Sequence, residues 1–88
     1  MKIAIAEDSA LLRAGLVELL AGRGHEVVAA AGDAEELFAA LETAQPDVVI
    51  LDNRMPPTHT SEGIRAALAL RETRPEIGVL LLSQYVET

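Results

Sequence analysis

Three acids and a serine follow directly on short apolar runs, at the positions where buried strands would end. Glu7 and Asp8 come after the first run, Asp52 after "VVIL", and Ser83 after "VLLL". Carboxylates brought close together repel one another unless a cation neutralises them. Oxygen-only donors favour Mg²⁺ or a similar hard ion. With such an ion, an Asp oxygen can act as a nucleophile toward phosphorus, so these residues point to phosphoryl chemistry.

The strands that would carry these residues are predicted from four apolar runs. Val48 to Leu51 form one unbroken run that ends in an acid, as expected for a strand that is buried on both faces and holds Asp52 at its tip. Three stretches of helical periodicity lie between the runs. The pattern is βαβαβαβ, and the predicted strands are residues 2–6, 26–30, 47–51 and 77–82.

The three helices are predicted from their apolar spacing and their ends. Leucines recur at helical spacing from Leu11 to Leu20, and glycines stop that helix. Asp33 is a plausible N-cap with Glu36 at the capping-box position, and the helix that follows is expected to bury Leu37, Phe38 and Leu41. A third helix opens near Thr60 or Ser61, runs through Ile64, Ala67 and Leu68, and ends before Pro75. Their leucines and alanines are expected to face the core.

Strands joined by single helices pair in parallel through right-handed crossovers, which places helices on both faces of the sheet. The fold class is therefore α/β, a doubly wound parallel sheet whose ligands bind outside the carboxyl ends of the strands. The fourth run, residues 79–82, resembles an interior strand, yet six residues follow it. We expect the element that would cover this strand to be missing, so the sheet is expected to be incomplete.

Composition narrows the function classes. The chain has 88 residues, seven basic and fourteen acidic, for a net charge of −7, which disfavours nucleic acid and anionic lipid as direct partners. It contains no cysteine, and no segment has the length of a secretory signal or a membrane span. We expect a cytoplasmic protein of one domain. The two histidines, His25 and His59, are expected to be solvent-exposed loop residues rather than metal ligands.

Three segments, "IAEDSALLRAGLVELL", "VVILDNRMPP" and "VLLLSQY", carry a resemblance to a known family. In this order and at these separations they resemble the receiver domain of bacterial two-component response regulators, of the NarL/LuxR type. The resemblance spans residues 1–88 and implies a flavodoxin-like fold that stops after the fourth strand. It also implies transcription regulation through a DNA-binding domain outside this chain. A receiver is a signalling domain, so we do not expect an enzyme.

The resemblance assigns roles by position. Asp52 would be the phosphoacceptor that takes a phosphoryl group from a sensor histidine kinase. Glu7, Asp8, Asp52 and the backbone carbonyl of Arg54 would hold Mg²⁺, and Ser83 would be the switch hydroxyl that bonds the phosphoryl oxygens. These assignments agree with the acidic cluster inferred from the strand ends.

One departure from the family pattern leaves an alternative function open. Receivers pair the phosphoryl group with a lysine at the end of a fifth strand, whereas the single lysine here is Lys2, at the opposite end of the sheet. The alternative is a phosphorylation-incompetent fragment that acts as an oligomerisation or interaction module. An uncovered fourth strand would favour a homodimer, with strand exchange as one route to it. A haloacid dehalogenase-type phosphatase is a remote alternative, because Arg54 stands where that family needs a second acid.

Overall fold

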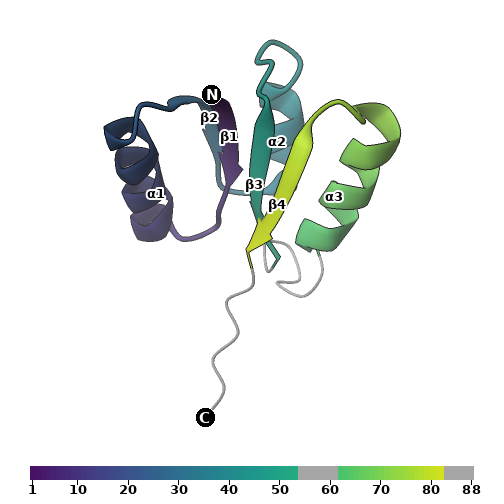
Figure 1. The fold of residues 1–88 in the computed structure, drawn as a ribbon. Coiled ribbons are helices and arrows are strands. Elements are labelled where there is room, and N and C mark those ends of the chain that lie inside the picture. The colour runs from purple at the N-terminus through teal and green to yellow at the C-terminus, as the bar shows by residue number, and fades with distance from the viewer. Residues whose placement is uncertain (54–61, 83–88) are drawn as a thin grey trace.

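The computed structural model describes residues 1–53 and 62–82 and shows one parallel sheet flanked by helices (Figure 1). In chain order the elements are β1 (Lys2–Ala6), α1 (Ala10–Gly22), β2 (Glu26–Ala31), α2 (Ala34–Ala40), β3 (Val48–Asp52), α3 (Glu62–Thr73) and β4 (Gly78–Leu82). The four strands lie in the order β2-β1-β3-β4, and every neighbouring pair is parallel. The predicted α/β fold class and the βαβαβαβ order are confirmed.

The predicted strands agree with the observed ones to within one residue at each end. The one-residue difference matters most at β3, because Asp52 is the last residue of that strand rather than the first residue after it. Its backbone therefore belongs to the sheet and pairs with Leu82 of β4. The predicted start of the third helix at Thr60 or Ser61 lies outside the described residues.

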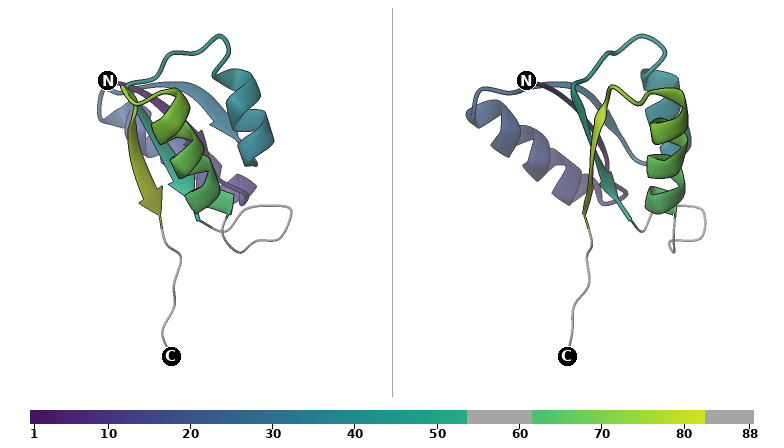
Figure 2. Two further views of the ribbon diagram at one scale, coloured as in Figure 1. Left: turned by 90° about the vertical axis from the view of Figure 1, so that its right-hand side faces the viewer. Right: turned by 45° about the vertical axis from the view of Figure 1, so that its right-hand side comes forward.

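The sheet separates two apolar clusters. Figure 2 shows from the side the helices that cover its two faces. On the face covered by α2 and α3, alternate residues of the central strands pack with Leu37, Leu41 and Leu70, all of which are nearly or fully buried. On the other face a smaller cluster of Ile3, Ile5 and Ile50 packs against α1. Two faces with continuous apolar strands between them are what the sequence pattern predicts for a parallel sheet.

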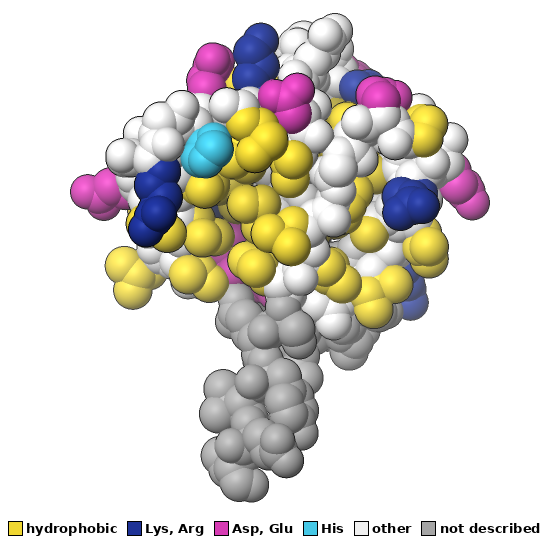
Figure 3. Space-filling view, viewed as in Figure 1, with side chains coloured by type: hydrophobic (Ala, Val, Ile, Leu, Met, Phe, Trp, Pro, Cys, Tyr) yellow, Lys and Arg dark blue, Asp and Glu magenta, His cyan; other side chains and the backbone are white. Residues whose placement is uncertain are grey.

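Helix α1 differs from the expectation that its leucines form a core face. It has no buried residue, and Leu11 and Leu19 are 86% and 54% exposed. Leu16 and Leu20 are half-buried and contact the Ile3, Ile5 and Ile50 cluster. Among the described residues α1 is the only helix on its face of the sheet, so much of its apolar surface has nothing to pack against. Figure 3 shows hydrophobic side chains gathered in a band across this view of the molecule.

Helix α3 is rotated relative to the expected apolar face. Ile64 and Leu68 are 43% and 61% exposed, and the buried apolar positions are Gly63, Ala66 and Leu70. The sequence offers two overlapping stripes one residue apart, and either satisfies helical spacing. The stripe that contains the glycine is buried because only a residue without a side chain lets the helix start approach β3, as described below.

The helix caps follow their predicted chemistry. Asp33 is the N-cap of α2, and its Oδ1 accepts a hydrogen bond of 2.7 Å from the backbone N–H of Glu36.

The burial of two side chains can be compared with expectation. Phe38, expected to be buried, is only partly buried. His25 lies in the loop before β2, as expected, but it is half-buried rather than exposed, and its Nδ1 has no hydrogen-bond partner among the described residues. His59 lies outside them.

Candidate functional site

Two of the predicted site acids meet at the carboxyl ends of adjacent strands. Strands β1 and β3 are neighbours, and the last registered pair between them is Ala6 with Leu51. One step further along each strand come Glu7 and Asp52. Their exposed fractions are only 1% and 3%, which is rare for acidic side chains without a compensating partner. The sequence predicts the meeting of this pair, whereas its near-complete burial is a finding of the structure.

Glu7 is held in place by the turn that leads into α1. Its Oε2 accepts a hydrogen bond of 2.9 Å from the backbone N–H of Ser9, and its carbonyl oxygen accepts one of 2.7 Å from Nη1 of Arg13. Ser9 is also the N-cap of α1, because its hydroxyl accepts a hydrogen bond of 3.2 Å from the N–H of Leu12. The first turn of α1 thus fixes the orientation of the Glu7 carboxyl group.

Burial raises the pKa of Glu7 above its usual value, because an ionised carboxylate loses its hydration there. A hydrogen bond to the side chain of Asp52 and the negative charges of Asp52 and Asp8 raise the pKa further, while the Ser9 N–H opposes them. A hydrogen bond between two carboxyl groups requires a shared proton. A divalent cation at this position would replace that proton and let both groups ionise.

The end of β3 is clamped between β4 and the start of α3. The N–H of Asn53 donates to the carbonyl of Leu82 over 3.0 Å, and the N–H of Gly63 donates to the carbonyl of Asn53 over 3.0 Å. A Cβ on Gly63 would lie against the carbonyl oxygen of Asp52 and 2.5 Å from Cα of Asn53. Glycine is therefore required here by close approach, and α3 begins directly against the residue that bears the candidate nucleophile.

The remaining predicted site residues are only partly placed. Asp8 is exposed and close enough to Glu7 to affect its pKa. Arg54 and Ser83 lie outside the described residues. Across residues 1–53 and 62–82, no three His, Cys, Asp or Glu side chains form a group that could hold a metal ion as they stand. The predicted pairing of the two strands is seen, whereas the three-carboxylate metal site stays a prediction.

The donor chemistry nevertheless suits a hard divalent cation. The buried Glu7 and Asp52 carboxyl groups provide oxygen donors only, which is the set that Mg²⁺ prefers. Beside them Asn53 carries a buried side-chain oxygen, Oδ1, that accepts no hydrogen bond from any described residue. A buried oxygen of this kind is costly unless a further donor or cation reaches it. Sequence reasoning missed Asn53, although its place next to Asp52 was the available signal.

Two other contributors were also missed. Arg13 supports the carbonyl of Glu7, and Gly63 sets the position of α3. The sequence around Arg13 does not indicate that its side chain reaches back to the segment before the helix. A glycine near a predicted helix start carries a weak signal for close backbone approach.

A family model described as response regulator receiver domain matches residues 3–88. Among characterised proteins, the transcriptional regulatory protein PdtaR of Mycobacterium tuberculosis (strain CDC 1551 / Oshkosh) is 39% identical over 85 residues, which cover 94% of this chain and 40% of PdtaR. The oxygen regulatory protein NreC of Staphylococcus haemolyticus is 38% identical over 86 residues, covering 97% of this chain and 39% of NreC. The chain thus spans about 40% of the length of these relatives.

The fold is shared with solved structures. The response regulator TrrA from Thermotoga maritima, in complex with Mg²⁺–BeF, superposes with a TM-score of 0.84 at 28% sequence identity. The match covers 96% of this chain and 70% of TrrA. This agreement confirms the flavodoxin-like arrangement expected from the sequence.

Proposed function

We propose a function for this chain, which belongs to the family of response regulator receiver domains. The family model matches nearly all of the chain, and two relatives are more than a third identical to it in sequence. The family resemblance expected from the sequence is confirmed. Within that family, we propose that Asp52 is the phosphoacceptor of this chain. The supporting observation is its position: a buried acid at the end of β3, hydrogen-bonded to Glu7, which directly follows the neighbouring strand β1.

The proposed reaction transfers a phosphoryl group to one carboxylate oxygen of Asp52. The new oxygen–phosphorus bond forms as the bond to the leaving group of the donor breaks, giving an acyl phosphate. Glu7, Asp8, Asp52 and the carbonyl of Arg54 would hold Mg²⁺, which would screen the charge of the phosphoryl oxygens. The complex of TrrA with Mg²⁺–BeF supports this cofactor for the family.

The described residues position the nucleophile. Strand β3 holds Asp52 at its end, between β1 and β4, so the sheet fixes the position of its backbone. The hydrogen bonds to Glu7 from Ser9 and Arg13 keep the second carboxyl group beside it. Positioning of this kind lowers the barrier for in-line transfer, because orientation is fixed before the donor arrives. Ser83 would bond the phosphoryl oxygens once they are in place.

The donor would be a sensor histidine kinase, and residues 1–88 would act as a switch within a longer regulator rather than as an enzyme. The relatives are named as regulatory proteins of greater length, which supports an output domain beyond the region that this chain matches. Together with a sensor histidine kinase as the donor, we propose that the chain acts in the cytoplasm. In the described part of the chain no helix has the length and apolar character to cross a membrane.

The direct test is the intact mass of the chain after incubation with acetyl phosphate and Mg²⁺. We expect one phosphoryl adduct in the parent and none in Asp52→Asn. The control is Asp47→Asn, at an exposed acid just before β3, which should also carry one adduct. An adduct that persists in Asp52→Asn would contradict the proposed acceptor. No adduct in any folded variant would favour the alternative of an interaction module that is not phosphorylated.

A second proposed property is self-association. Strand β4 pairs with β3 on one side, and in the described ranges no strand pairs with its other side. Leu80 of β4 is 52% exposed. By alternation along the strand it shares a face with Leu82, which packs against the Ile3, Ile5 and Ile50 cluster on the α1 side. Open edges next to apolar surface favour pairing with another copy. Sedimentation velocity should show a dimer that Leu80→Glu dissociates, whereas Leu68→Glu on the exposed side of α3 leaves it intact; a monomer at all concentrations would contradict this.

A further inference from the structure

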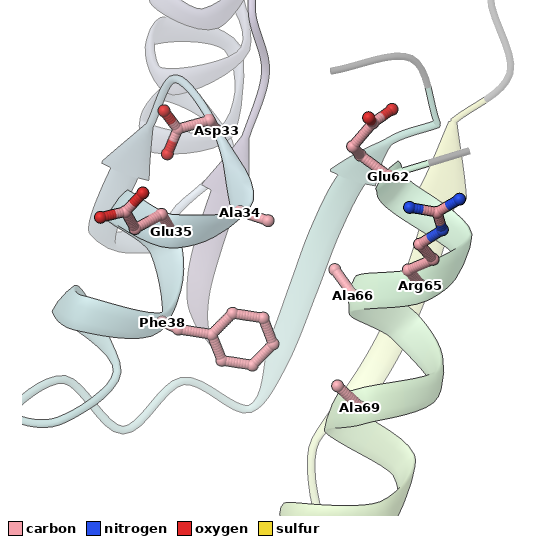
Figure 4. Close-up of a pocket in the computed structure, with 8 residues that line it drawn as sticks. All are labelled: Asp33, Ala34, Glu35, Phe38, Glu62, Arg65, Ala66 and Ala69. Atoms are coloured by element: carbon pink, nitrogen blue, oxygen red, sulfur yellow. The ribbon is translucent and has the colours of Figure 1, made fainter. Parts of the chain in front are cut away.

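A cavity of about 460 Å³ lies between α2 and α3 (Figure 4). Ala34 and Phe38 of α2 point toward α3, and Ala66 and Ala69 of α3 point back toward α2. The cavity exists because three of these four residues are alanines, whose methyl groups are too short to meet across the gap. The Phe38 ring is partly buried against the core and gives the cavity an aromatic wall. A volume of this size is typical of sites that bind a side chain or a small organic group.

The mouth of the same cavity is lined by charged residues. Asp33 and Glu35 come from the start of α2, and Glu62 and Arg65 come from the first turn of α3. Among the described lining residues, three carboxylates and one guanidinium give a formal charge of −2, within a chain whose total is −7, and one of these carboxylates, that of Glu62, is nearly buried. Asp33 is anchored as the N-cap of α2, so its charge is held at the mouth. The cavity therefore combines an apolar interior with an anionic entrance.

From this combination we propose that the α2–α3 cavity is a docking site for an arginine side chain, flanked by apolar residues, on a partner protein. A guanidinium is planar and weakly hydrated, so it can stack on an aromatic ring and hydrogen-bond to carboxylates in the same pose. The Phe38 ring faces α3 across the cavity, and Asp33 and Glu35 line its α2 side, where their carboxylates point away from α3 (Figure 4). Lysine fits less well, because its compact and strongly hydrated ammonium cannot bond two carboxylates through a planar fork.

The occupant is favoured to be a peptide segment by charge and by shape. The acidic chain attracts basic partners and repels acidic ones, so an anionic ligand is disfavoured at this mouth. The alanine-lined walls accept the methylene stem of arginine and an apolar neighbour. No described residue that lines the cavity is a proposed phosphoryl or metal ligand, although Glu62 directly precedes Gly63, which lies against Asp52.

The test is a titration of the ¹⁵N-labelled 88-residue chain with the peptide Ac-Leu-Arg-Leu-NH₂, followed by amide chemical shifts. The matched probe replaces arginine with citrulline, which keeps the shape and removes the charge, and a third probe carries lysine. We expect saturable shifts in residues 33–38 and 62–69, with the citrulline peptide about fivefold weaker or more. Equal affinity for the arginine and citrulline peptides, or shifts confined to α1 and β4, would overturn the proposal.

Variants separate the two contacts. Phe38→Leu keeps an apolar side chain but removes the ring face, and Glu35→Gln removes one entrance charge; each should weaken the arginine peptide severalfold. Glu42→Gln removes an exposed carboxylate beyond the end of α2 and serves as the matched control for charge. Unchanged affinity in both cavity variants, with spectra that show a folded protein, would also overturn the proposal. An equal loss of affinity in Glu42→Gln would show that only the net charge of the chain matters, and it would overturn the proposal as well.

Discussion

Replacing Glu7 with Gln should stabilise the chain at neutral pH when no divalent cation is added. Glu7 is 1% exposed, and burial, the hydrogen bond to Asp52 and neighbouring charges all raise its pKa. Ionising Glu7 at neutral pH therefore places a second negative charge beside Asp52 at a buried position. A glutamine of the same shape donates an N–H to Asp52 without needing a shared proton.

The pH dependence follows from linkage. Because the folded-state pKa is raised, the contribution of Glu7 to stability is fully present below its ordinary value of 4.5 and is lost as pH rises through the folded-state pKa. Parent and Glu7→Gln should thus have similar stability near pH 4 and diverge above it. A gain of about 1 kcal/mol at pH 7.5, the size of one hydrogen bond to a charged group or less, corresponds to about 4–8 °C in Tm for a domain of this size.

Thermal unfolding followed by circular dichroism, from pH 4 to pH 8, measures this difference. Glu18→Gln, an exposed position on α1, is the control for net charge. Adding Mg²⁺ at pH 7.5 should raise the Tm of the parent more than that of Glu7→Gln, since Glu7 offers the cation a carboxylate and glutamine does not. A Glu7→Gln chain that is less stable than the parent at pH 7.5, or equally stabilised at pH 4, would refute the reasoning.

Two further predictions concern the elements that hold the site. Gly63→Ala should destabilise by about 1–3 kcal/mol in urea unfolding, because its Cβ would lie 2.5 Å from Cα of Asn53. Gly15→Ala, in the exposed interior of α1 with nothing within 4 Å, should instead stabilise by about 0.5–1 kcal/mol; the same sign for both would contradict the close approach. Ser9→Ala should cost about 1 kcal/mol by removing the N-cap of α1, whereas Ser9→Asp should retain most of the stability.

Much of the fold could be predicted from the sequence because local and global signals agree. The unbroken run before Asp52 specifies a strand buried on both faces, and Asp33 with Glu36 specifies the start of α2. The pairing of β1 with β3 follows from topology, and with it the meeting of Glu7 and Asp52. These predictions needed only periodicity, capping chemistry and the rules of parallel sheets.

The features that could not be predicted depend on tertiary contacts. The rotation of α3 is set by the contact of Gly63 with β3, which periodicity cannot distinguish from a stripe one residue away. The exposure of Leu11 depends on how much of its face other elements cover. The cavity beside Phe38 arises from alanines on two helices that only the fold brings together. In each case spacing along one helix contains no information about its neighbour.

The most direct test of the central claim is to locate the phosphoryl group after reaction with acetyl phosphate and Mg²⁺. Borohydride reduces an acyl phosphate to an alcohol, so a phosphorylated aspartate becomes homoserine. Tandem mass spectrometry of the tryptic fragment that ends at Arg54 can then distinguish Asp52 from Asp47 and Asp33, which lie in the same fragment. We predict homoserine at position 52 alone. Homoserine at either of the other two positions, or at Asp8 in the first part of the chain, would contradict the assignment of Asp52 as the phosphoacceptor.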